Sequence, residues 1–422
     1  MAHLSQADRL AAGLHALPDS TEPFAATQAA WRFFANPRID LPQLAQPLIE
    51  AARSAIPRTC DQWTLVILDW SLLHFGGHGS KADRVTLAHR RDLGYELLTA
   101  LAVSDRDGHP LAPLCLELRA ADGLHTTRCV TPAHTLSPLD GLDPVMKHVE
   151  SLSLARPSVY IIDREADSCR HLREWHRAGR HVLVRANETR RVLHQGREMT
   201  MCDVASTLAL KVERQITVQG APATQSVGET RVVLHRAARE NRIVDGQRCR
   251  REIPGEALEM RLIVSEIRAN DDRVIGRWLL LTNVPTHVGA ATLALWYYYR
   301  WRIESYHKLL KGAGQQVESW LQDDAAAMAR RLCVVAMATL LVWNLARETS
   351  PQADELRKLL VRLSGRQMKR GPGQRGFTEP ALLAGLGVLI PMLCLLQHHD
   401  LENLKCLARQ TSAFNAFPIK SG

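Results

Sequence analysis

The stretch WTLVILD at residues 63–69 decides the fold, together with its counterpart SVYIID at residues 158–163. Each is a run of apolar residues of strand length, and each is followed directly by an aspartate, Asp69 in the first and Asp163 in the second. Continuous apolar runs of this length are typical of buried strands. We therefore expect two buried strands that each end at an acidic side chain.

Helices are expected before the first of these strands. Residues 1–60 are rich in alanine and leucine, with breaks at prolines 18, 23 and 37, and Asn36-Pro37 is a turn signal. A third short apolar run, His181–Val184, follows the second aspartate and predicts another strand.

The pattern changes between about residues 186 and 285. Short runs with partial alternation at Arg214–Gln219, Glu229–His235 and Glu259–Arg268 predict a β-rich insertion. Among them is a cluster of arginines that we interpret as a basic loop: Arg236, Arg239, Arg242, Arg248, Arg250 and Arg251. Such a loop is either a DNA contact or a disordered, solvated segment.

Strong helical patterns resume at Thr292 and continue to about Ala346, with a break near Gly312–Gly314. A second break, Gly371–Gly376, precedes a last apolar helix. The apolar stretches Leu332–Trp343 and Ala381–Leu396 are both shorter than the roughly 20 residues that a membrane-spanning helix needs. We therefore expect both to be buried helices rather than membrane spans.

Bulk composition narrows the class of protein. The 422 residues contain 46% hydrophobic and 23% charged residues, as in soluble globular proteins. The formal net charge of +9 and the pI of about 9.2 favour a polyanionic partner such as nucleic acid. Nine cysteines without a close C-x-x-C pair argue against a zinc ribbon or a disulfide framework. Together with the lack of an apolar N-terminal leader, this predicts reduced thiols in the cytosol.

The sequence YYYRWRIESYHKLLK at residues 297–311 is the richest in functional side chains. On a continuous helix, five of its side chains would share a stripe about 60° wide. They are Tyr297, Arg300, Glu304, Lys308 and Lys311. The simplest interpretation is a solvated face with ion pairs at i,i+4 spacing. The density of tryptophan and tyrosine in this helix instead suggests partial burial.

Three acids on two strands and one helix make a plausible site for hard metal ions and phosphate. Mg²⁺ prefers carboxylate oxygen and keeps several waters, so a few acids and substrate phosphates complete its shell. Two such ions support in-line displacement at a phosphodiester. The candidate ligands are Asp69, Asp163 and Glu304.

Several motifs resemble one known family. The spacing Tyr297, Arg300, Glu304, Lys311 is similar to the Y-R-E-K signature of the insertion-sequence-4 family of DDE transposases, in the branch that contains the bacterial kanamycin-resistance composite transposon. DREAD at 163–167 resembles its second-aspartate motif, and AWRFFANP at 30–37 resembles a motif of its N-terminal DNA-binding region. The resemblance extends from about residue 25 to 346.

The resemblance implies an RNase H-like α/β core at 61–345, interrupted by the β-rich insertion. It further implies a helical DNA-binding region at 1–60 and a helical dimerisation region at 346–422. Asp69, Asp163 and Glu304 would bind Mg²⁺, which Mn²⁺ could replace. The partners would be double-stranded DNA, as transposon ends and target, and a second copy of the chain, with no membrane. The DNA-binding side chains would be Tyr297, Arg300, Lys308, Lys311, Arg185 and Trp278, with Trp278 stacking on a flipped base.

Each assignment has a structural alternative. Asp163 could cap the following helix, and Asp69 could be a turn residue. Trp278 could be ordinary core, and Arg185 could pair with Glu188 or another acid.

Two other functions also remain open from sequence. The first is a nuclease of the same fold that cuts DNA without joining it. The second is a non-catalytic regulator that pairs with a parent transposase, which is considered because the N-terminal region looks short beside that of known relatives.

Overall fold

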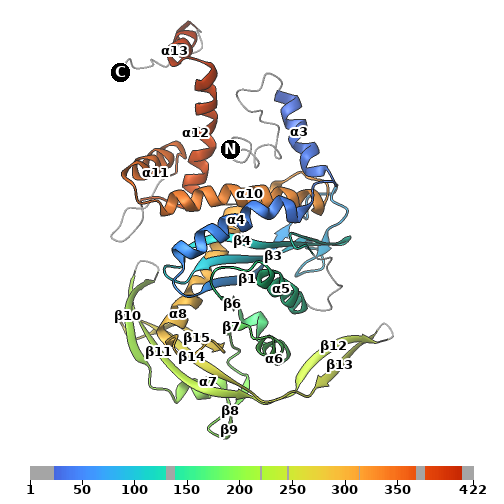
Figure 1. Ribbon diagram of the computed structural model, residues 1–422, viewed down its shortest axis with the longest axis vertical. Coiled ribbons are helices and arrows are strands. Elements are labelled where there is room, and N and C mark those ends of the chain that lie inside the picture. Colours follow the sequence, from blue (N-terminus) through green and yellow to red (C-terminus); the bar gives the residue numbers. More distant parts are fainter. Residues whose placement is uncertain are drawn as a thin grey trace.

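The computed structural model describes residues 23–129, 138–218, 221–244, 247–312, 314–366 and 376–410. Within these residues the chain is a mixed α/β protein built on a 13-stranded sheet (Figure 1). Its strands follow the order β5-β4-β3-β1-β6-β7-β15-β14-β11-β8-β9, with β10 beside β11 and β2 beside β3. The sheet therefore runs through the expected core and the expected insertion without interruption.

The first half of the sheet carries the two expected acidic strands. It contains β1 (Thr64–His74), β2 (Val85–Thr86), β3 (Leu93–Ser104), β4 (Pro110–Ala120), β5 (Gly123–Thr126), β6 (Ser158–Ile162) and β7 (His181–Arg185). The first five pair antiparallel, whereas β1, β6 and β7 pair parallel. The parallel strands β6 and β7 are the predicted runs, and that prediction is confirmed.

The prediction that a strand ends at Asp69 is wrong. Residues Thr64–Leu68 are fully buried as expected, but β1 continues through Asp69 to His74. The continuation is possible because β3 is equally long and pairs with β1 as far as His74, opposite Gly94. Asp69 consequently lies in the middle of a strand, opposite Thr99, and is not a turn residue.

The insertion is built almost entirely of strands, as predicted. It contains β8 (Arg191–His194), β9 (Arg197–Thr200), the short helix α7 (Met201–Ser206), β10 (Lys211–Val218), β11 (Ala221–Leu234), β14 (Leu258–Ala269) and β15 (Val274–Thr282). Strand β15 joins this half to β7 through an antiparallel pairing of Leu280 with Arg185.

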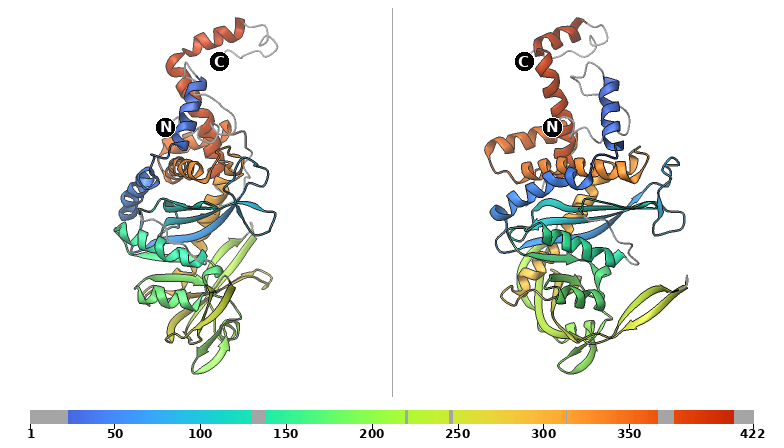
Figure 2. Two further views of the ribbon diagram at one scale, coloured as in Figure 1. Left: turned by 90° about the vertical axis from the view of Figure 1, so that its right-hand side faces the viewer. Right: turned by 45° about the vertical axis from the view of Figure 1, so that its right-hand side comes forward.

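The arginine cluster does not form a loop, which corrects the prediction. All of its arginines except Arg236 lie on a separate two-stranded ribbon of β12 (Ala238–Val244) and β13 (Gln247–Ile253). This ribbon extends away from the rest of the molecule (Figures 1 and 2). Val244 pairs with Gln247, so only Asp245-Gly246 separates the two strands. An Asp-Gly pair between two strand-like runs is a strong hairpin signal in a sequence.

Helices line both halves of the sheet. At the N-terminal end, α3 (Pro23–Ala35) and α4 (Leu41–Thr59) flank the predicted Asn36-Pro37 turn, while residues 1–22 with Pro18 lie outside the described residues. Helix α4 packs on β4 together with α10 (Ala325–Arg347). The short helices between strands are η1 (Pro138–Gly141), α5 (Leu142–Ser151), η2 (Arg164–Ala166) and α6 (Cys169–Arg177).

Two successive helices cross from one half of the sheet to the other. Helix α8 (Ala290–Tyr299) packs on β11 and β14, whereas α9 (Trp301–Leu310) packs on β1 and β3. The expected break after α9 is present, since a short turn η3 (Val317–Ser319) separates it from α10. Residues 371–375 of the second expected break lie outside the described residues.

The two apolar helices have opposite environments. Both α10 and α12 (Glu379–His398) are long and apolar enough to cross a membrane by length and composition. In the most apolar window of α10, 83% of the residues are buried, as in the core helix of a soluble protein. In that of α12 the share is 18%, so the prediction of a buried helix there is wrong. Figure 1 shows why: α12 extends beyond α11 (Pro351–Leu363), with α13 (Leu401–Gln410) at its far end.

Candidate active site

Strand register brings the two aspartates together. Strands β1 and β6 pair in parallel up to Leu68 and Ile162, so the next residues along each strand are Asp69 and Asp163. Neighbouring strands lie about 4.8 Å apart, and side chains at equivalent positions of parallel strands point to the same face. The two carboxyl groups are therefore placed side by side at the point where β6 ends.

The helix expected to carry the third acid is interrupted. Helix α8 ends at Tyr299 and α9 begins at Trp301, with Arg300 as the residue between them. There the backbone bonds have i→i+3 spacing, from Arg300 N to the Tyr297 carbonyl and from Ile303 N to the Arg300 carbonyl. The prediction of one continuous helical stripe is therefore wrong over residues 297–311, because the helix is broken at Arg300 and Lys311 lies beyond its last residue.

A single guanidinium contacts all three predicted ligands. Arg300 Nη1 lies 3.2 Å from Asp69 Oδ2, and Nη2 lies 2.6 Å from Glu304 Oε1 and 3.6 Å from Asp163 Oδ2. The Arg300 side chain is only 8% exposed, whereas those of Asp163 and Glu304 are 35% and 39% exposed. Three acids from β1, from the turn after β6 and from α9 thus surround one buried cation.

Burial dominates the electrostatics of Asp69. It raises the pKa of that carboxyl to about 6, although Arg300 and the backbone N–H of Trp70 act in the opposite direction. The neighbouring carboxylates of Asp163 and Glu304 raise the pKa further. Burial and the two neighbouring acids thus both disfavour the ionised form of Asp69, and a carboxyl perturbed in this way is typical of functional sites.

Asp163 both caps a turn and takes part in the cluster. Its side chain accepts a hydrogen bond from the backbone N–H of Arg164 at 2.6 Å. The predicted alternative, that Asp163 caps the helical turn that follows it, is therefore confirmed. The same carboxylate also accepts a hydrogen bond from the Tyr297 hydroxyl at 3.1 Å. Burial raises the pKa of Tyr297, which keeps its phenol neutral as a donor.

Three of the remaining predicted DNA-binding residues have half-buried or exposed side chains: Trp278, Arg185 and Lys308. Trp278 is half-buried on β15, with its ring centroid 6.4 Å from that of Tyr297, so it borders the site instead of lying deep in the core. Arg185 lies close enough to influence the pKa of Tyr297 and forms no ion pair within the described residues, Glu188 included. Lys308 is exposed on α9.

Lys311 was also predicted to bind DNA, but its side chain lies outside the cluster of Arg300 and the three acids. Its ammonium donates to the Leu72 carbonyl of β1 at 2.5 Å and lies 3.7 Å from Glu318. It therefore fastens the end of α9 to β1.

The donor set suits a hard divalent ion, because every candidate ligand is a carboxylate and the three already share a cation. Within the described part of the chain, however, no three acidic, histidine or cysteine side chains close on a common point as they stand. The oxygens converge on the two terminal nitrogens of Arg300, so a metal would have to occupy space that the guanidinium now fills.

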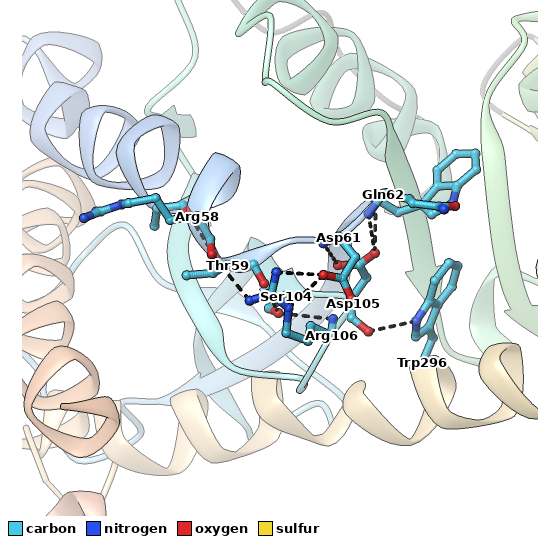
Figure 3. A network of polar contacts seen from close by, with 10 residues as sticks. Arg58, Thr59, Asp61, Gln62, Ser104, Asp105, Arg106 and Trp296 are labelled. Atoms are coloured by element: carbon cyan, nitrogen blue, oxygen red, sulfur yellow. Dashed lines mark hydrogen bonds and ion pairs between the residues drawn. The ribbon is translucent and has the colours of Figure 1, made fainter. Parts of the chain in front are cut away.

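A second polar network fastens α8 to the sheet (Figure 3). Asp105, in the turn between β3 and β4, accepts hydrogen bonds from the backbone N–H groups of Asp61, Gln62 and Trp63, at 2.7, 3.0 and 3.0 Å. Its own carbonyl accepts from the indole of Trp296 at 3.1 Å. This network, called the Asp105 knot below, joins the start of β1 to α8, the helix that ends one residue before Arg300.

Sequence reasoning missed the Asp105 knot. The segment SDRDGH at 104–109 carries a turn signal, but its long-range partners follow only from the fold. Comparison with protein-family models gives no match, and comparison with curated proteins gives none either.

Proposed function

We propose that this chain is a cut-and-paste DNA transposase that cleaves and joins DNA at a centre made by Asp69, Asp163 and Glu304. One observation carries the proposal: three carboxylates that are far apart in sequence surround a single cation. Acids repel one another, and the single charge of Arg300 does not balance three carboxylates, so the cluster favours the binding of a further cation. A phosphoryl-transfer centre that binds metal ions would explain why the chain has this cluster of carboxylates.

The arrangement of the strands supports an RNase H-like catalytic core as part of this proposal. Strands β4, β3 and β1 form an antiparallel meander, and β6 and β7 continue it in parallel. This combination, with acids on β1 and directly after β6, is what an RNase H-like core has. The β-rich insertion would then lie between the second and third acids, as the resemblance implies.

Mg²⁺ would be held by the three carboxylates, and Mn²⁺ could replace it. When bound, such ions activate the attacking oxygen and stabilise the leaving oxygen of a phosphodiester. The chain's own residues orient these ligands. Tyr297 holds Asp163 by a hydrogen bond, and the backbone N–H of Trp70 holds Asp69 at 2.9 Å.

The neighbouring side chains suit DNA. Arg185 and Lys308 are free to contact phosphate, and the half-buried Trp278 offers a ring face on which a base can stack. Water would release a 3′-hydroxyl at the transposon end, and that hydroxyl would attack the opposite strand to form a hairpin. A second water would then open the hairpin and regenerate the 3′-hydroxyl, which would later attack target DNA and join the released end to it.

The rest of the chain would serve DNA binding and pairing. The net charge of +9 fits a DNA partner. The N-terminal helices up to residue 60 would contact transposon ends, and the exposed helices after residue 346 would pair two subunits.

The test uses DNA that contains the gene with its genomic flanks, since inverted repeats there would be the ends. Wild type and Glu304→Ala are incubated with this DNA and Mg²⁺ or Mn²⁺. The proposal predicts cleavage at the repeats by wild type alone, followed by joining to a target plasmid. Undiminished cleavage by Glu304→Ala would overturn the assignment of the metal site.

Two other outcomes identify the alternatives. Cleavage without any joined product, even when pre-cut ends are supplied, indicates a nuclease. Binding to the repeats without cleavage indicates a regulator.

A further inference from the structure

The position of Arg300 raises a question about how a metal could enter. The three carboxylates carry a formal charge of −3, and Arg300 compensates one unit of it. Two units of negative charge therefore remain uncompensated while Arg300 is in place, which favours the approach of a further cation. The space between the carboxylates, however, is taken by the guanidinium.

The contacts of Arg300 are confined to this cluster. Its two terminal nitrogens bind the three acids, and its Nε is buried without a hydrogen-bond partner among the described residues. The nearest ring is that of Tyr297, with the guanidinium carbon 5.9 Å from the ring centroid. Since no other hydrogen-bond acceptor among the described residues holds the guanidinium, the three carboxylates are its only hydrogen-bonding and ion-pair partners there.

We propose that Arg300 is a positioning residue that assembles the three carboxylates before metal arrives and is displaced when metal binds. This inference rests on the metal site of the proposed function. A guanidinium has five N–H donors in a rigid fork, so it can hold several carboxylates at once, whereas a lysine ammonium is a compact point charge. Arg300 thus keeps the site folded while it is without metal.

Displacement follows from charge. A divalent ion bound to the same oxygens would lie a few ångströms from the guanidinium and repel it. The break between α8 and α9 at Arg300 places this side chain at the end of one helix and the start of the next, beside the half-exposed Glu304. Once displaced, the guanidinium is available to a phosphate oxygen of DNA, the partner that the sequence predicted for it.

This mechanism predicts competition between Arg300 and metal. The apparent metal affinity equals the intrinsic affinity multiplied by the fraction of molecules in which arginine does not engage the carboxylates. Removing the guanidinium therefore increases the affinity, because it frees the carboxylates and also removes a positive charge that repels the metal ion. An arginine that only stabilised the fold would leave metal affinity unchanged or lower it.

The experiment measures Mn²⁺ binding to the full chain without DNA, by calorimetry and by the loss of the free Mn²⁺ signal in electron paramagnetic resonance. Arg300→Ala is expected to bind Mn²⁺ about tenfold more tightly than wild type, and Arg300→Lys is expected to lie between them. Glu304→Gln tests whether Mn²⁺ binds at this site, because the substitution should weaken Mn²⁺ binding both in wild type and in Arg300→Ala. Equal or weaker Mn²⁺ binding by Arg300→Ala would overturn the inference.

A matched control is Arg302→Ala. It removes the same charge two residues along the chain, at the start of α9, but Arg302 influences the pKa values of His109 and Tyr299 and not that of Asp69. Its Mn²⁺ affinity should equal that of wild type.

A thermal melt checks folding and gives a second readout. Without metal, Arg300→Ala should unfold at a lower temperature than wild type, because three acids lose their counterion, and Mn²⁺ should raise its melting temperature more than it raises that of wild type. If Arg300→Ala does not fold, Arg300→Gln takes its place, since its amide can still donate to one carboxylate.

The two proposals fail in different ways. If wild type binds no Mn²⁺ and neither do the arginine variants, the metal site itself is wrong and this inference falls with it. If wild type and Arg300→Ala bind Mn²⁺ equally and both lose it on Glu304→Gln substitution, only the role given to Arg300 is wrong.

Discussion

Two polar centres of this protein each join one charged side chain to three partners, and they differ in what those partners are. At the Asp105 knot, one carboxylate accepts from three backbone N–H groups of consecutive residues. At Arg300, one guanidinium contacts three carboxylates that repel one another. The backbone N–H groups carry no net charge and do not repel one another, so the Asp105 knot needs no further partner. The second centre keeps surplus negative charge, which is typical of a site that binds something else.

This comparison separates stability from function. Changes at the Asp105 knot should lower the free energy of unfolding, while changes at the carboxylates should remove activity and leave stability unchanged or higher. The four predictions that follow test that separation, beginning with the largest expected effect.

Replacing an acid of the Arg300 cluster should abolish activity without unfolding the protein. We expect Glu304→Gln to reduce DNA cleavage by at least about a thousandfold, because a metal ligand is lost. Its melting temperature should equal or exceed that of wild type, because one repelling charge is gone. Cleavage is followed on labelled DNA, and unfolding by circular dichroism.

The matched control for that prediction is Glu318→Gln. Glu318 also meets β1, where it accepts from the backbone N–H of His74 at 3.0 Å, but it lies outside the cluster. A loss of cleavage equal to that of Glu304→Gln would contradict the special role of the three acids.

Removing the carboxylate of the Asp105 knot should have the opposite signature. Asp105→Ala leaves three backbone N–H groups without their acceptor, one of them buried and two part-buried, at a cost of about 3 kcal/mol in the free energy of unfolding. Urea denaturation measures this cost, and Asp105→Asn, which keeps one acceptor oxygen, should lose about half of it. A loss below about 1 kcal/mol would show that the knot is not a stabilising centre.

The turn that carries Asp105 also supports the end of α8. Gly108 has φ +68°, and a Cβ there would lie 2.2 Å from Cδ1 of Tyr299, the last residue of α8. Gly108→Ala should cost about 2 kcal/mol, from backbone strain and from displacement of that ring. Gly179→Ala is a matched control, since Gly179 has φ +72° with open space around it. Equal losses in both variants would mean that the contact with Tyr299 contributes nothing.

The smallest effect is expected at the indole of Trp296. Trp296→Phe removes the hydrogen bond to the Asp105 carbonyl and should cost about 1 kcal/mol more than the same change at Trp175. Trp175 is a suitable reference because it is fully buried and its Nε1 has no hydrogen-bond partner among the residues that the structure describes. If the two variants are equally destabilised, the link between the Asp105 knot and α8 is not a stabilising contact.

The sequence predicted the strands better than their ends. Apolar runs located β6 and β7 because burial on both faces leaves an unbroken apolar signal. The sequence predicted the end of β1 at Asp69, because an acid in a strand looks like an interruption unless the length of the pairing partner β3 is known. In the same way, Lys311 matched a helical stripe by spacing, but its contact with Leu72 depends on where α9 meets β1.

The candidate acids were predicted, but the way they are held was not. Spacing indicated that Glu304 and Arg300 lie a turn apart, and an i,i+4 ion pair was one interpretation. That pair is present, yet the same arginine also reaches Asp69 and Asp163. Contacts between residues more than a hundred positions apart follow from strand register and from the helix break, neither of which is visible in local sequence.

The most direct test of the central claim is anomalous diffraction from crystals of the protein bound to its flanking repeat DNA and soaked in Mn²⁺. The account predicts a manganese peak within about 2.5 Å of carboxylate oxygens from Asp69, Asp163 and Glu304, with the Arg300 guanidinium moved away. The absence of any peak there, with the three acids still held by Arg300 in the assembled complex, would contradict it.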